Sequence, residues 1–282
     1  MTTKQSPSSL YLWKKRTLYI GPLFEPISLS QGAASLLISL DKPLDLKLDV
    51  DGLCARSNSI LVPPNVNFTV DTGNAVVVDC MLDPLGQDYA ALLGEMQTVG
   101  SGSNAISYNI RNESAYIRSF RDLYKGQYSS SETYKILDDL ILPSERKLKL
   151  DFRIDPRIEL IIDMIQQNIS DNLSIESLAE HVNLSVPQLV HNFKVQTGVP
   201  IRRYRLWHRL YVTSELMGIS GNLTTAAISA GFSDSSHFCH TFQNMLGMKP
   251  SSILSQPNQI RIITEECDEH ASEFVGKMQN KL

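Results

Sequence analysis

The sequence of 282 residues is poor in the groups that build disulfide frameworks and metal centres. Its four cysteines, Cys54, Cys80, Cys239 and Cys267, are scattered and form no CxxC pair. This pattern is typical of reduced thiols inside a cell and disfavours a disulfide scaffold or a zinc site. We therefore predict no metal and no other cofactor.

The N-terminal half contains no histidine, because the first histidine of the chain is His181. No imidazole is available there as a general base or as a metal ligand. Cys54 and Cys80 lie on turn or apolar segments, so no nucleophile–base pair is visible either. We predict that the chain is not an enzyme.

Long apolar runs and positive charge are also lacking. No run approaches the roughly 18 residues of a membrane span, and the N-terminus shows no signal peptide. We expect a cytoplasmic protein without a membrane partner. The net charge is −4, and residues 151–258 carry eight Lys and Arg against nine Asp and Glu. A DNA-binding domain is usually basic, so this balance bears on any contact with DNA.

Strand patterns dominate residues 17–85. Leu44, Leu46 and Leu48 alternate with Asp45 and Lys47, which is the period of a half-buried strand. Several short strands with regular turns predict a small sandwich or barrel. Two amphipathic helices follow before Pro143, and either they cover their own barrel or they pair with a second subunit. Residues 143–153 are charged and lack helical periodicity, which indicates a linker.

The stretch from 174 to 242 repeats one pattern. Residues 178–193 read LAEHVNLSVPQLVHNF, and residues 226–242 read AAISAGFSDSSHFCHTF. The two copies share a small residue, a turn residue and a hydroxyl residue, at Ala179 and Ala227, Asn183 and Gly231, and Ser185 and Ser233.

Each shared position has a physical reason. Alanine lets two helices cross closely, and asparagine or glycine tolerates the positive φ of a tight interhelical turn. Serine after the turn predicts an N-cap, and Gln188 completes a capping-box spacing with Ser185. The repeat therefore predicts two helix-turn-helix units at about residues 176–197 and 223–246, joined by a long helix from about Ile201 to Met217.

Further motifs extend this pattern from residue 155 to about 254. They are Phe193-Lys194 with Gly198, Tyr204 with Arg209-Leu210, Gly231-Phe232-Ser233-Asp234-x-Ser236-His237-Phe238, Phe242, and Gly247-x-x-Pro250-Ser251. This series resembles the DNA-binding domain of AraC/XylS-type transcription regulators. More faintly, residues 60–68 followed by Leu82-Asp83-Pro84 resemble the cupin-like sensor domain of that family, although Asn67 stands where relatives often have histidine.

The resemblance implies an α+β chain in four parts. They are a β-rich, cupin-like sensor and dimerisation domain with two amphipathic helices (1–142), a linker (143–153), an all-α DNA-binding domain (154–258) and an acidic tail (259–282). The tail has no assigned role, and a helix is expected around residues 271–278. The implied function is that of a bacterial activator or repressor that binds promoter DNA, works with RNA polymerase, forms a homodimer and responds to a small molecule or a partner. The alternative is the same fold acting mainly through protein contacts, with weakened DNA binding.

In such a domain the second helix of each unit reads base edges. The outward residues we expect at the bases are Pro187, Gln188, Val190, His191, Ser235, Ser236, Cys239 and His240. Lys194, Arg202, Arg205, Arg209 and Lys249 are expected at phosphates, although Arg209 is equally suited to a pair inside the domain. Relatives most often carry arginine at the positions of His191 and His240. Histidine is mostly neutral at pH 7, so we expect DNA binding to strengthen on protonation.

Overall fold

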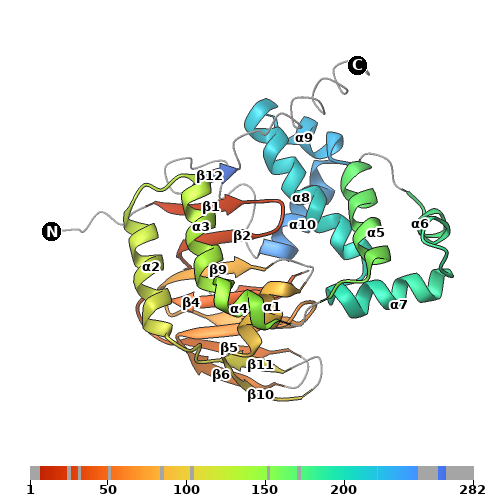
Figure 1. The fold of residues 1–282 in the computed structure, drawn as a ribbon. Coiled ribbons are helices and arrows are strands. Elements are labelled where there is room, and N and C mark those ends of the chain that lie inside the picture. The colour runs from red at the N-terminus through yellow and green to blue at the C-terminus, as the bar shows by residue number, and fades with distance from the viewer. Residues whose placement is uncertain are drawn as a thin grey trace.

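The computed structural model describes residues 7–23, 27–30, 33–49, 52–82, 86–101, 105–150, 153–169, 173–220, 222–246 and 260–264. A β-rich N-terminal domain lies beside a helical C-terminal domain (Figure 1). The predicted α+β fold is confirmed. The helix expected around residues 271–278 lies outside the described residues. In the part of the chain that the structure covers, no helix is long and apolar enough to cross a membrane.

Two sheets build the N-terminal domain. The larger runs in the order β10 (Gln97–Val99), β11 (Ile106–Tyr108), β7 (Ser59–Val62), β4 (Ser35–Ser39), β9 (Val76–Met81), β2 (Thr17–Pro22), β1 (Ser8–Leu12) and β12 (Ile260–Thr264). The smaller runs in the order β3 (Ile27–Ser30), β8 (Asn67–Asp71), β5 (Leu44–Leu48) and β6 (Cys54–Ser57). Neighbouring strands are antiparallel except β1 and β12, which are parallel.

The central strands of the larger sheet, from β7 to β1, are buried on both faces, which explains why they read as largely continuous apolar runs. Leu10 and Leu37 face the smaller sheet, whereas Tyr11 and Leu36 face the helices. Strand β5 of the smaller sheet alternates buried and exposed residues, as the sequence predicts. Its leucines meet Phe68 in the space between the sheets, so side chains fill the interior.

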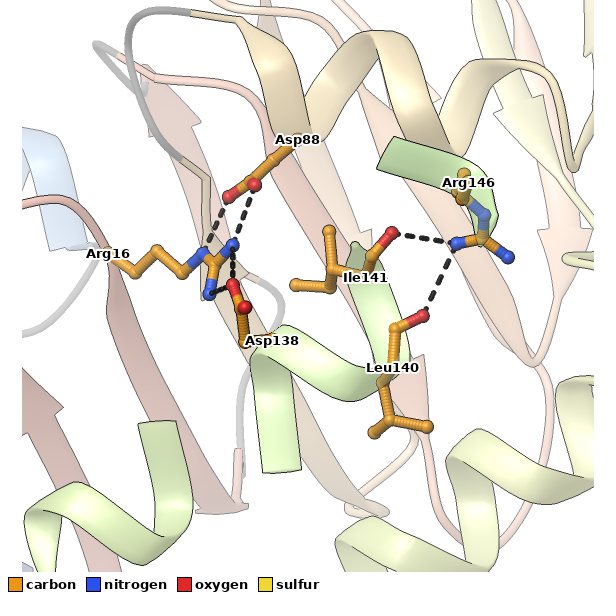
Figure 2. Close-up of polar contacts among 6 residues, drawn as sticks. All are labelled: Arg16, Asp88, Asp138, Leu140, Ile141 and Arg146. Atoms are coloured by element: carbon orange, nitrogen blue, oxygen red, sulfur yellow. Dashed lines mark hydrogen bonds and ion pairs between the residues drawn. The ribbon is translucent and has the colours of Figure 1, made fainter. Parts of the chain in front are cut away.

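Three helices cover the outer face of the larger sheet: α1 (Gln87–Leu93), α2 (Glu113–Lys125) and α3 (Ser130–Ile141). Arg16, in the β1–β2 turn, fixes two of them (Figure 2). Its guanidinium donates to both carboxylate oxygens of Asp88 at 2.7 Å and to Asp138 at 3.1 Å. Burial lowers the pKa of Arg16, but the hydrogen bond and charge of Asp88 raise that pKa by more, so the guanidinium stays charged.

The segment predicted as a charged linker without helical periodicity contains a short helix, α4 (Ser144–Lys149). A side chain of α4 caps the end of the preceding helix α3, and the sequence pattern does not reveal this contact. Arg146 donates to the carbonyl oxygens of Ile141 at 2.8 Å and Leu140 at 3.3 Å (Figure 2). These carbonyls belong to the last turn of α3 and lack helical partners. The contact therefore holds α4 against α3.

The C-terminal domain consists of helices α5 (Pro156–Gln167), α6 (Ile175–His181), α7 (Val186–Thr197), α8 (Ile201–Ser220), α9 (Leu223–Ser229) and α10 (Ser235–Leu246). Asp155 caps α5, whose first residue is proline. Its buried stripe contains Ile158, Ile161, Ile162 and Ile165.

The two domains share one hydrophobic cluster, which joins Phe68 of β8 to Phe238 and Met245 of α10. Helix α10 lies against β3. A second contact between the domains is polar: Arg203 of α8 donates to the side-chain oxygen of Asn65 at 2.6 Å.

Strand β12 is a feature that the sequence does not predict, because it lies in the segment expected to be an acidic tail. It returns from the C-terminal domain and pairs with β1 from Ser8 opposite Ile260 to Leu12 opposite Thr264. Its composition, IRIIT, is that of a strand, and Arg261 donates to the hydroxyl of Ser9 at 3.1 Å. The chain therefore closes on its own first strand.

Candidate nucleic-acid interface

The first helix-turn-helix unit has the geometry that its sequence predicts. Ser174 caps α6, and Ser185 forms a full capping box with Gln188 at the start of α7. Asn183 adopts φ 52° in the turn between them, the left-handed conformation expected there. Ala179 is buried at the crossing of the two helices.

The second unit repeats this geometry with one change. Gly231 adopts φ 88°, and a Cβ at this position would lie 2.8 Å from the carbonyl oxygen of Ile169. Asp234, not Ser233 as predicted, caps α10 by accepting from the His237 backbone at 2.7 Å. That hydrogen bond holds the pKa of Asp234 below its ordinary value. The extra residue in the second copy moves the cap one position along the chain.

Helix α8 connects the two units. It has 20 residues, which corresponds to a length of about 30 Å. Successive major-groove segments on one face of DNA are about 34 Å apart. The length of the connecting helix is therefore comparable to one turn of DNA.

The outward face of α7 contains every residue predicted there. The exposed side chains are Pro187, Gln188, Val190, His191 and Lys194, together with Val195, which was not predicted. Leu189 and Phe193 are buried on the opposite face. The oxygen of the Gln188 side chain accepts from Ser185 at 3.0 Å, so the capping box occupies the acceptor of this amide.

The outward face of α10 differs in part from the prediction. Ser236 and His240 are exposed, but Ser235 and Cys239 are half-buried, and Cys239 packs against the hydrophobic cluster. Two exposed amides extend the face by one turn and escaped prediction. They are Gln243 and Asn244, and the latter lies 3.1 Å from the His240 ring. Continuing the three-and-four spacing from Ser236 and His240 would have found both.

The predicted phosphate contacts fall into two groups. Lys194 and Arg202 are exposed. Arg205 is half-buried and donates to the carbonyl oxygen of Leu173 at 2.6 Å. Arg209 is half-buried beside Gly231, and burial lowers the pKa of both Arg205 and Arg209. Lys249 lies outside the described residues.

His208 of α8 is a buried group with a different character. It is only 4% exposed, and neither ring nitrogen makes a hydrogen bond of normal geometry. Burial lowers its pKa to about 4, and the nearby Gln166 backbone offsets this only in part. The ring stacks on Tyr211 and is neutral at pH 7. Among the residues that the structure describes, no group of three or more His, Cys, Asp or Glu could hold a metal ion.

Comparison with known proteins supports the interpretation of the C-terminal domain as a helix-turn-helix domain. Residues 178–256 match the family model of a helix-turn-helix domain. The HTH-type transcriptional activator RhaS of Escherichia coli O139:H28 is 32% identical over 98 residues, which cover 34% of this chain and 35% of RhaS. The arabinose operon regulatory protein of Escherichia coli (strain K12) is 26% identical over 154 residues, 50% of this chain and 53% of that protein. The resemblance to AraC-type regulators is confirmed.

The matched regions span about a third to a half of these curated relatives. A solved structure covers more of the chain. The apo form of a ToxT variant from Vibrio cholerae matches with a TM-score of 0.57 over 86% of this chain and 97% of that chain, at 13% identity. This likeness shows that the two-domain fold is common to both proteins.

Proposed function

We propose that this chain, which carries an AraC-type helix-turn-helix domain, is a transcription regulator that binds specific sites in double-stranded promoter DNA. The relatives that it matches are named as a transcriptional activator and an operon regulatory protein, not as enzymes. A cytoplasmic location in a bacterium and contact with RNA polymerase belong to this proposal.

One observation carries the proposal. Two capped helix-turn-helix units present exposed faces on α7 and α10 and are joined by a helix of about 30 Å. This length suits two reading helices in successive segments of the major groove on one face of DNA.

The base-reading side chains in this proposal are Pro187, Gln188, Val190, His191, Ser235, Ser236, Cys239 and His240, supplemented by Gln243 and Asn244. Lys194, Arg202 and Lys249 contact phosphate. Arg205 and Arg209 contribute through the shape of the domain and through long-range charge, because both are half-buried within it. Few exposed cations predict a shallow dependence of affinity on salt.

The N-terminal domain in this proposal senses a small molecule or a partner and forms a homodimer. Its contacts with the DNA-binding domain support such control. Helix α10 lies against β3, and Arg203 of α8 bonds to Asn65, so a change in these N-terminal segments would act on a reading helix and on the helix that joins the two units. The alternative function, a regulator acting mainly through protein contacts, is favoured by the near-neutral charge of residues 151–258.

A mobility shift with the DNA upstream of its own gene tests the proposal. We expect a complex specific for that DNA, with an affinity that falls only modestly as salt is raised, and His191→Ala or His240→Ala should weaken binding by about 1–2 kcal/mol, roughly tenfold. His181→Ala is the matched control, because this exposed histidine lies on α6, outside the reading faces. Equal affinity for that DNA and for unrelated DNA, unchanged in both variants, would support the alternative.

A further inference from the structure

The two reading helices differ in chemistry. The exposed side chains beside His191 in the first half of α7 are the apolar Pro187 and Val190, together with Gln188. Val190 is 39% exposed. The corresponding face of α10 is polar throughout and consists of Ser236, His240, Gln243 and Asn244.

Hydrogen-bonding groups on the face of α7 are few. The capping box occupies the acceptor oxygen of Gln188. Lys194 lies in the second half of the helix, whereas the N-terminal residues of a reading helix approach the base edges. In the first half of α7, His191 and the nitrogen of Gln188 therefore remain as polar groups beside the apolar Pro187 and Val190.

In the major groove the apolar group on a base edge is the C5-methyl of thymine. We infer that α7 selects its DNA segment through a thymine methyl group, which Val190 contacts, whereas α10 selects through hydrogen bonds. This inference rests on the proposed function, since it names what the first reading helix recognises.

Replacing thymine by deoxyuridine tests the inference, because this change removes the methyl group and preserves every hydrogen-bonding group. A bound duplex is first selected from a random-sequence library with the full chain, and each thymine is then replaced in turn. Burial of one methyl group corresponds to about a fourfold change in affinity. We expect a loss of about fourfold at one or two thymines in the segment read by α7, and less than twofold in the segment read by α10.

The variant Val190→Ala should bind the thymine duplex and the deoxyuridine duplex equally well. Leu160→Ala is the matched control, because Leu160 is an exposed apolar residue on α5 and this variant should keep the fourfold difference. Thermal unfolding checks that each variant is folded. If a specific duplex is selected but no thymine is sensitive, the inference fails and the proposed function stands. If the library gives no preferred duplex, the proposed function itself fails.

Discussion

Arg16 shows how much a single buried side chain contributes to the N-terminal domain. It is 3% exposed and pairs with Asp88, which is 1% exposed. Arg16→Met should lower the free energy of unfolding by about 3–5 kcal/mol, because it leaves the Asp88 carboxylate buried without its partner. Urea denaturation measures this loss. Asp138→Asn is the control, since Asp138 is 46% exposed and its loss should cost less than about 1 kcal/mol. Similar losses in both variants would contradict the assignment.

His208 makes stability depend on pH. Burial lowers its pKa to about 4 in the folded chain, against about 6.5 in the unfolded chain. Between these values the unfolded state binds more protons, so stability falls as the pH falls. We expect this group to lower the free energy of unfolding by about 2 kcal/mol between pH 7 and pH 5.

The variant His208→Leu tests this role. At pH 7 it should lower the free energy of unfolding by less than about 1 kcal/mol, because neither ring nitrogen is well hydrogen-bonded. Urea denaturation at both pH values should show a smaller pH effect in the variant, and an unchanged effect would refute the role of His208.

At the scale of elements, the two interhelical turns give a matched comparison. Gly231→Ala should lower the free energy of unfolding by about 2–3 kcal/mol, because φ is positive and the new Cβ would lie 2.8 Å from the Ile169 carbonyl oxygen. Asn183→Ala should lower it by only about 1 kcal/mol, because strain at φ 52° is the principal cost there. Thermal unfolding of both variants compares the two turns. The prediction fails if the asparagine variant is the less stable one.

The helices that could be predicted from sequence are those with a local signal. Each of these signals depends on a few neighbouring residues. They are the capping box of Ser185 and Gln188, the turn residues Asn183 and Gly231, and the stripe of isoleucines in α5. Helix α4 was not predicted, because its six residues show no helical periodicity and the contact from Arg146 to the end of α3, although local, follows no recognised capping pattern. The reading faces were predicted in part, because the burial of Cys239 depends on packing across the domain.

At the scale of the molecule, the division into two domains could be predicted from the change in periodicity, but the contacts between them could not. The bond between Arg203 and Asn65 and the approach of α10 to β3 join residues far apart in sequence. Pairing of β12 with β1 is likewise set by the tertiary structure, because a five-residue apolar strand carries no local sign of its partner. Helices α2 and α3 cover their own sheet, and their pairing with a second subunit stays a prediction.

A fragment of residues 151–258 should bind the selected duplex at least about tenfold more weakly than the full chain. The fragment has little positive charge, and it loses both the proposed dimer and the contacts that hold α10. Fluorescence anisotropy at fixed salt compares the two proteins, and circular dichroism checks that the fragment is helical. A folded fragment that binds as tightly as the full chain would rule out a need for the N-terminal domain.

The pairing of β1 with β12 also has a consequence for synthesis. Translation proceeds at about 5–20 residues per second, and almost the whole chain separates these two strands. The edge of the larger sheet at β1 therefore remains unpaired for roughly 10–50 seconds, until β12 has been synthesised. An open strand edge is a template for pairing with another chain. Neighbouring nascent chains on one messenger RNA thus meet while this edge is unpaired, and the ribosome sets the time available for them to exchange strands.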